Sequence, residues 1–260
     1  MVNWPDIGNK LQEQFKIKTY PIGYKRFESA DDIDGIPDLR GPDHEVSVCM
    51  MISQARRWGH TVGTKRTDKK VLSYCAMIHG LMKVPSKMLE APPADTEMPD
   101  YLARWVANWD DYFRRTRALP RIPVGEAILF SPLQTITVEP DVVLIYADPA
   151  QVMLMIQAME KVEFERYQFG CIGESSCADS LVDCYLSGKP KVGLPGYGER
   201  ALGHVADEEI VLALPPSYVP RIIDGFNKLR NTGVVYPIAL AGLDCDSNIL
   251  SLYERPTRLA

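Results

Sequence analysis

Asp141–Ala158, DVVLIYADPAQVMLMIQA, is the stretch that decides the predicted fold. Val142–Ala147 is an unbroken apolar run rich in β-branched residues, which is typical of a strand buried on both faces. Asp148-Pro149 then ends the strand, because Asp is a favoured N-cap and proline suits the first helical position. The helix that follows, Gln151–Glu160, is apolar around most of its circumference and must pack against a sheet.

The segments on both sides of this unit alternate between helical and strand patterns. Helices are predicted at Asp6–Lys16, in the second part of Glu45–Arg57, and at Leu72–Lys83, Asp100–Arg117, Ser175–Leu186 and Pro216–Leu229. Strands are predicted at Lys18–Phe27, Ala127–Phe130, Glu163–Phe169, Lys191–Leu194 and Ile210–Leu214. Interleaved elements of this kind indicate an α/β or α+β fold. We expect a mixed sheet with flanking helices in one compact domain, residues 1–230, and a C-terminal extension, residues 231–260, packed on it.

Composition narrows the class of protein. The chain has 260 residues, 46% hydrophobic and 24% charged, as in ordinary globular proteins. Its net charge of −5 argues against a nucleic-acid partner. No run of 18 apolar residues and no signal-peptide core are present, so we expect a cytoplasmic protein without a membrane partner. A homo-oligomer is compatible with the sequence. In the cytosol, six cysteines favour burial, metal binding or catalysis over disulfides.

A glycine-rich stretch, Gly193–Gly203, is one candidate binding site. The backbone N–H groups of Gly196, Tyr197 and Gly198 can approach an anion, and Arg200 can pair with a carboxylate or phosphate. The alternative is a turn between two strands that contains a structural Arg–Glu pair. His204 follows the stretch and is a candidate catalytic acid or base.

The Asp148-Pro149 turn is a second candidate, because ligands in open α/β sheets lie beyond the carboxyl ends of strands. Asp148 and Gln151 are the side chains that would contact a polar substrate there. The alternative is that Asp148 only caps the helix.

Two further features lie between residues 65 and 79. Cys75 and His79 are four residues apart on a predicted helix, so they share a face and form either a metal pair or a buried thiol beside a helix-end histidine. The basic run before this helix is expected to be a solvated face: Lys65, Arg66, Lys69 and Lys70.

Three stretches together resemble the DUF169 family of archaeal and anaerobic bacterial proteins. They are Pro132-Leu133, Pro140–Met153, and Leu194–Ala201 with the acidic triplet Asp207–Glu209 behind it, and the similarity runs from about Leu11 to Leu229. The resemblance implies family cysteines at the positions of Cys49, Cys75 and Cys177, and often a fourth where this chain has Gly196. The family's Asp in that motif is Glu199 here. The resemblance brings no particular activity with it.

Three thiolates with a vacant fourth position suit an iron–sulfur cluster whose open iron binds substrate, or a catalytic zinc that carries water. Cys171 or Cys184 are candidate fourth ligands. The alternative is that Cys49, Cys75 and Cys177 are ordinary buried thiols. Sulfurs more than about 8 Å apart would not share one metal site.

Two hypotheses of function follow. The first is an enzyme of anaerobic metabolism, a lyase or oxidoreductase, that uses a cysteine-ligated iron–sulfur cluster or metal on a small anionic molecule, aromatic or CoA-linked. The second is a non-catalytic binding or accessory protein that holds a small ligand and whose cysteines are structural. Iron analysis of an anaerobic preparation separates the two.

Overall fold

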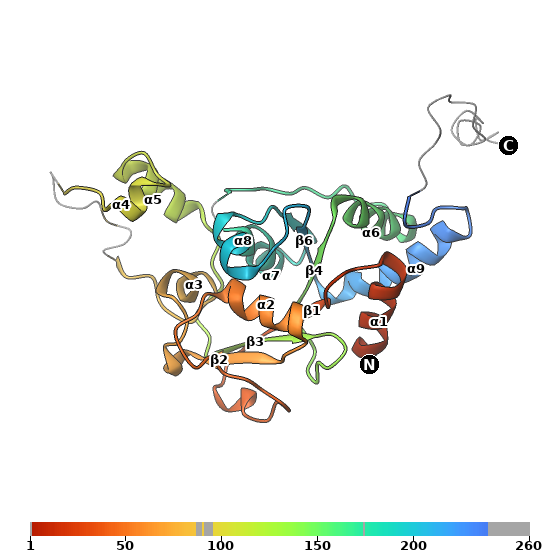
Figure 1. The fold of residues 1–260 in the computed structure, drawn as a ribbon, viewed down its shortest axis with the longest axis horizontal. Coiled ribbons are helices and arrows are strands. Elements are labelled where there is room, and N and C mark those ends of the chain that lie inside the picture. Colours follow the sequence, from red (N-terminus) through yellow and green to blue (C-terminus); the bar gives the residue numbers. More distant parts are fainter. Residues whose placement is uncertain (1, 87–89, 91–95, 174, 239–260) are drawn as a thin grey trace.

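The fold is built on one sheet. The computed structural model describes residues 2–86, 90, 96–173 and 175–238, and in this part of the chain a six-stranded sheet has the order β2-β3-β1-β4-β6-β5 (Figure 1). Every named strand pair is antiparallel, and parallel pairing occurs only at two isolated bridges. The predicted α/β or α+β class is therefore confirmed, in its antiparallel form. The strands are β1 (Ile22–Phe27), β2 (Val62–Lys65), β3 (Ala127–Pro132), β4 (Val142–Ala147), β5 (Lys191–Gly193) and β6 (Ile210–Leu214).

Strand β4 lies inside the sheet between β1 and β6, and all six of its residues are buried. Because side chains alternate along a strand, Val142, Leu144 and Tyr146 pack in one core cluster and Val143, Ile145 and Ala147 in another. The interior strand predicted from the apolar run is confirmed.

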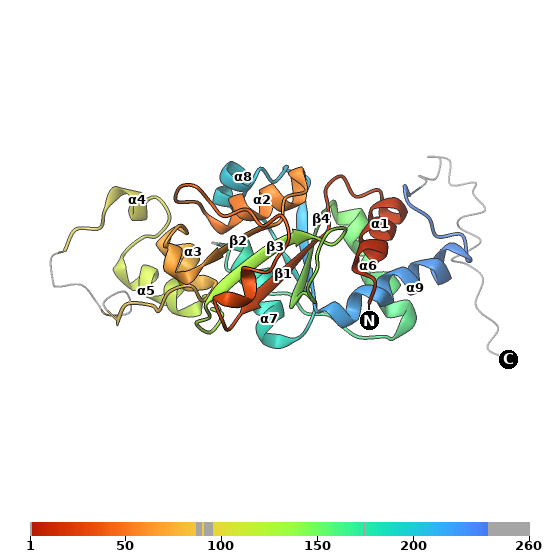
Figure 2. The same cartoon turned by 90° about the horizontal axis from the view of Figure 1, so that it is seen from below.

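The helices α1 (Trp4–Phe15), α6 (Pro149–Val162) and α9 (Val219–Arg230) cover one face of the sheet (Figures 1 and 2). Helix α6 starts at the predicted Asp-Pro turn. It is buried on one side only, since Met153 is exposed. At Gly225 of α9 an added Cβ would lie 1.7 Å from the Ala158 carbonyl oxygen of α6, so only glycine permits this close helix contact. We call this side the helical face.

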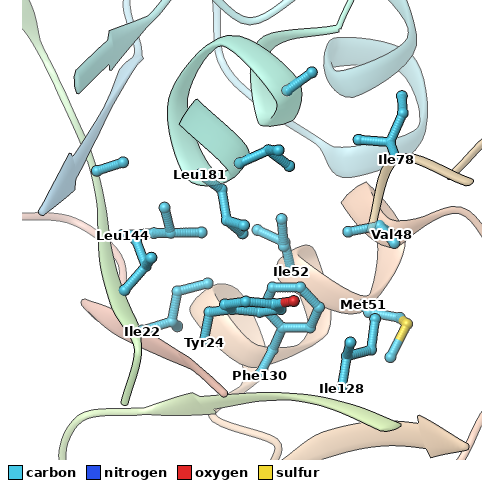
Figure 3. Close-up of a cluster of buried hydrophobic side chains, with 14 of the residues drawn as sticks. Ile22, Tyr24, Val48, Met51, Ile52, Ile78, Ile128, Phe130, Leu144 and Leu181 are labelled. Atoms are coloured by element: carbon cyan, nitrogen blue, oxygen red, sulfur yellow. The ribbon is translucent and has the colours of Figure 1, made fainter. Parts of the chain in front are cut away.

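The opposite face carries α2 (Val48–Trp58), α3 (Ser73–Ile78), the π-helical turn η4 (Ala178–Val182), α7 (Asp183–Ser187) and α8 (Tyr197–Gly203). Figure 3 shows its core, where Tyr24 and Phe130 from the sheet meet Ile52 of α2 and Leu181 of η4. We call this side the cysteine face, because Cys49, Cys75, Cys177 and Cys184 all lie on its elements.

Several predicted segments differ from the structure for local reasons. Helix α3 is shorter than Leu72–Lys83, because Gly80 adopts a left-handed φ of 73°. Asp100–Arg117 is two helices, α4 (Asp100–Ala103) and α5 (Trp109–Ala118), since Asn108 caps the second one. Strand β2 lies in a segment for which no strand was predicted, and the predicted strand Glu163–Phe169 is not a strand. Short 3-10 turns occupy Asp31–Ile33, Arg66–Asp68 and Pro216–Tyr218.

The start of the predicted C-terminal extension, up to residue 238, lies against the helical face through Val234 and Tyr236. The rest of the extension, with Cys245, lies outside the described residues. None of the helices in the described ranges has the length and apolar character needed to cross a bilayer.

Candidate functional site: a three-cysteine cluster around Glu199

An isolated parallel β-bridge between Val46 and Val71 brings the first turns of α2 and α3 together. The Val46 N–H donates to the Lys70 carbonyl and the Leu72 N–H donates to the Val46 carbonyl, both at 2.9 Å. Cys49 and Cys75 each lie in the first turn of their helix. Charge on Cys75 raises the pKa of Cys49, which places the two thiols within electrostatic range of each other.

Helix α8 closes over Cys49. The Cys49 Sγ lies 3.9 Å from the Gly198 carbonyl oxygen and 2.9 Å from the hydroxyl of Ser47, the N-cap of α2. At Gly203 an added Cβ would lie 3.0 Å from the Cys49 Cβ, so a small residue there lets α8 approach α2. The predicted glycine-rich turn is therefore a helix that packs on a cysteine.

Cys177 supplies the third thiol, from the turn that precedes η4. Its Sγ lies 3.1 Å from the Ser175 hydroxyl and 3.3 Å from Nε2 of His79. Immediately after Cys177 the chain enters a π-helical turn, a feature that is frequent at functional sites. Charges on Cys49 and Cys75 both raise the pKa of Cys177, so the three thiols belong to one region.

Glu199 is the carboxylate at the centre of this region. Its two oxygens accept hydrogen bonds from the backbone N–H groups of Cys177 (2.9 Å) and Gly196 (2.7 Å), the second as part of the capping box of α8. The side chain is buried, and its negative charge raises the pKa of Cys49, Cys75 and Cys177. We call the three cysteines and Glu199 the thiol cluster.

Burial keeps these thiols protonated. It is the largest cause that raises the pKa of Cys49 to about 11 and the pKa of Cys177 well above its ordinary value. Burial also raises the pKa of Cys75, against a hydrogen bond from the Val48 backbone that lowers it. Because the thiolate is the nucleophile and the metal ligand, the raised pKa values disfavour the reactive form of these thiols.

His79 lies behind Cys177 and is completely buried. Burial lowers its pKa to about 3, so the imidazole is neutral at physiological pH. Nε2 faces Cys177, whereas Nδ1 has no hydrogen-bond partner in the described part of the chain. A neutral histidine beside a protonated thiol differs from the thiolate–imidazolium pair of a cysteine nucleophile.

The donor types of the thiol cluster fit a soft metal, because thiolates select zinc, copper(I) and iron–sulfur clusters. Among the described residues, however, no group of three or more His, Cys, Asp or Glu side chains is placed to hold a single metal ion. The cluster thus has the donor chemistry of a soft-metal site, and the predicted metal stays a prediction.

Of the two candidate fourth ligands, Cys171 is the one beside the cluster. It is exposed, and Glu199 is among the groups that raise its pKa, after burial and Asp179. Cys184 is buried in the apolar core of the cysteine face, where burial raises its pKa to about 12.

The other predicted residues of the glycine-rich stretch belong to α8 or cap its C-terminus. Arg200 donates to the carbonyls of Pro195 (3.1 Å) and Ala206 and lies 3.8 Å from Asp207. Its guanidinium therefore stabilises the segments on both sides of α8. Tyr197 is exposed, with its ring 5.6 Å from that of Trp105. His204 is exposed at the C-terminus of α8, against Trp58 at 6.2 Å. Their predicted roles in binding and catalysis stay predictions.

Asp148 and Gln151 lie on the helical face, on other elements than the thiol cluster. Asp148 caps α6, and the Gln151 side chain accepts from the Asp148 N–H and donates to the Phe15 and Lys16 carbonyls. Tyr236 donates to the second Asp148 oxygen at 2.8 Å. The strand-end argument for a ligand here assumed parallel strands, and β4 has antiparallel neighbours.

Sequence reasoning found the three cysteines and His79 but did not assign Glu199 to the site. The signal for Glu199 is its position three residues after Gly196, the capping-box spacing. Its second bond, to the Cys177 N–H, joins residues 22 positions apart and has no local signature.

The fold and the site define an antiparallel α+β protein whose sheet carries a thiol cluster on one face. The DUF169 family, described as "Uncharacterised ArCR, COG2043", matches residues 10–225, and the chain belongs to this family. It is similar to the uncharacterized protein MJ0308 of Methanocaldococcus jannaschii, with 24% identity over 229 residues that cover 86% of this chain and 93% of the relative. No solved structure matches the chain.

Proposed function

We propose that the thiol cluster binds an iron–sulfur cluster through Cys49, Cys75 and Cys177, and that the protein acts on a small anionic molecule there. The observation that carries the proposal is the packing of the three cysteine segments: the Val46–Val71 bridge joins the starts of α2 and α3, Gly203 of α8 packs on Cys49, and Glu199 of α8 accepts from the Cys177 N–H. An iron without a protein thiolate would bind and polarise the anionic molecule when the group is present.

Electrostatics support a cationic partner. Each thiol has a raised pKa, and Glu199 contributes to all three shifts. A bound metal lowers thiol pKa values, because metal binding releases the protons of its ligands. The arrangement is therefore unfavourable for free thiolates, and a metal that binds here has to displace the thiol protons.

Zinc is the alternative group. A tetrahedral zinc with Zn–S bonds of about 2.3 Å draws its sulfurs to about 3.8 Å from one another. Among the described residues, no group of three or more His, Cys, Asp or Glu side chains is placed to hold such a single ion.

The test is anaerobic purification of the chain, followed by iron and sulfide analysis and a visible spectrum. We expect iron and sulfide in equal amounts, with the broad visible absorption of an iron–sulfur cluster. Cys49→Ser, Cys75→Ser and Cys177→Ser should each lose most of the iron. Cys184→Ser is the matched control, since this thiol lies in the apolar core, and it should keep the iron.

Iron-free protein after anaerobic reconstitution with iron and sulfide would contradict the proposal. The remaining hypothesis would then be a ligand-binding protein with structural cysteines. Equal iron loss in the Cys184→Ser control would show that general destabilisation, and not ligation, explains the variants.

A further inference from the structure

A cavity of about 450 Å³ lies on the outer side of α3, lined by residues from the end of β2 to Lys83. Its volume falls within the range of small-molecule sites. Ala76 of α3 lines this cavity, whereas the preceding residue, Cys75, belongs to the thiol cluster. Helix α3 therefore separates two different chemical environments.

The wall of the cavity is cationic, although the chain as a whole has a net charge of −5. Five basic side chains line it, against the single carboxylate of Glu45: Lys65, Arg66, Lys69, Lys70 and Lys83. Four of these residues form the basic run that the sequence predicted to be a solvated face. They are exposed or half-buried, and the turn after β2 also gathers them around one cavity.

Two of the five charges are neutralised within the protein. Lys65 Nζ lies 2.7 Å from the Asp34 carboxylate, and Arg66 pairs with both oxygens of Glu126 at 2.8 and 3.1 Å. Lys70 Nζ donates to the Asp43 backbone carbonyl, which carries no charge.

Lys69 and Lys83 form no ion pair with any residue that the structure describes. Three lysine charges thus face one carboxylate. Their excess matches a ligand group with about two negative charges.

The floor of the cavity is aliphatic. Val71, Ala76 and Leu81 are buried there and Met82 is half-buried, and none of the described lining residues is aromatic. A nucleobase or another planar ring would have no stacking partner among these side chains. An aliphatic chain would remove both its own surface and the floor from water.

We propose that this cavity binds a soluble phosphate or diphosphate ester of an aliphatic molecule. Phosphate is favoured over carboxylate because the unpaired cations are lysines, which bind phosphate as point charges, and the one arginine fork is occupied by Glu126. This inference does not rest on the thiol cluster, since no cysteine lines the cavity among the described residues.

The experiment is isothermal titration calorimetry of the full chain with four probes: pyrophosphate, isopentenyl diphosphate, ADP and citrate. Isopentenyl diphosphate should bind more than about tenfold tighter than pyrophosphate, because its alkyl group reaches the aliphatic floor. ADP should bind more weakly than isopentenyl diphosphate, and citrate should not bind measurably.

Variants locate the binding. Lys69→Gln with Lys83→Gln should weaken isopentenyl diphosphate binding by more than about tenfold. Lys10→Gln with Lys161→Gln, two lysines on the helices of the opposite face, makes the same change in net charge and should leave binding unaltered. Met82→Ser should reduce the advantage of isopentenyl diphosphate over pyrophosphate. Cys49→Ser should bind like the parent chain, which separates this test from that of the iron proposal.

Any of four outcomes would overturn the inference. The first three are no binding of either diphosphate, citrate binding as tight as isopentenyl diphosphate, and an equal loss of isopentenyl diphosphate affinity in the control double variant. The fourth is binding to vesicles that contain phosphatidic acid without binding of the soluble ester, which would identify a membrane headgroup as the ligand.

Discussion

Both faces of the sheet have an apolar core, but their helices are joined in different ways. On the helical face α6 and α9 pack through Gly225 and apolar side chains, and the polar groups of Asp148 and Gln151 are satisfied by hydrogen bonds. On the cysteine face, α2 and α8 are joined by polar contacts. The fully buried Arg56 donates to both Glu209 oxygens and to the His204 carbonyl.

Unsatisfied buried groups mark the same difference. In the described part of the chain, three fully buried side chains of the cysteine face carry polar atoms without a hydrogen bond: Tyr24 Oη, Ser53 Oγ and His79 Nδ1. Those near the helical face, such as on Gln14 and Tyr167, belong to half-buried residues. Each buried polar atom without a hydrogen bond costs free energy, so its presence needs an explanation other than packing. The difference teaches that the fully buried polar groups of the two faces are treated differently: those of the helical face are paired, whereas several of the cysteine face are not.

The largest expected effect is on the polar contacts of the cysteine face. Arg56→Met should lower the free energy of unfolding by about 3–5 kcal/mol, because Glu209 would keep a buried charge without its partner. Urea denaturation measures this change. Arg66→Gln, which breaks the partly exposed pair with Glu126, is the control and should cost less than about 1 kcal/mol. Similar losses in both variants would refute the distinction between buried and exposed pairs.

The packing of the helical face gives the next effect. Gly225→Ala should cost about 3 kcal/mol, since the added Cβ would collide with the Ala158 backbone. Gly203→Ala meets the Cys49 Cβ at 3.0 Å and should cost about 1 kcal/mol. Thermal unfolding of the two variants compares the helix contacts directly. If Gly203→Ala were the more damaging change, the cysteine face would be the tighter of the two.

Acid should affect the cysteine face through His79. Its pKa is about 3 in the folded protein and about 6.5 when unfolded. Below pH 6.5 the unfolded chain takes up a proton that the folded chain excludes, so stability is full above this pH and falls as the pH drops towards 3. The loss from His79 is about 2 kcal/mol near pH 5. Between a pH above 6.5 and pH 5, the free energy of unfolding of His79→Leu should therefore fall by about 2 kcal/mol less than that of the parent chain. Urea titrations at these two pH values measure the difference. An unchanged pH dependence would show that His79 is protonated when folded.

The smallest expected effect concerns the loop before β6. Arg200→Gln removes the hydrogen bonds to the Pro195 and Ala206 carbonyls at a partly exposed position, and it should cost about 1 kcal/mol. The iron content of an anaerobic preparation should not change. A loss of iron without a loss of melting temperature would instead return Arg200 to the binding role predicted from sequence.

The sequence by itself determined the centre of the fold. The apolar run at β4 and the Asp-Pro start of α6 are set by local preferences, and both were predicted correctly. Local preferences did not decide strand direction, because an apolar run reads the same in parallel and antiparallel sheets. The expectation of a ligand at Asp148 depended on that undetermined direction.

Only the tertiary structure decided the two sites. The bridge between Val46 and Val71 brings Cys49 to Cys75, and Glu199 reaches across 22 positions to the Cys177 N–H. The basic run after β2 lines a cavity because Ala76 of α3 and Lys83 line the same cavity. Such contacts join residues with no regular spacing along the chain. These contacts form only when the helices and strands pack together, so they cannot be predicted from any short segment of the sequence.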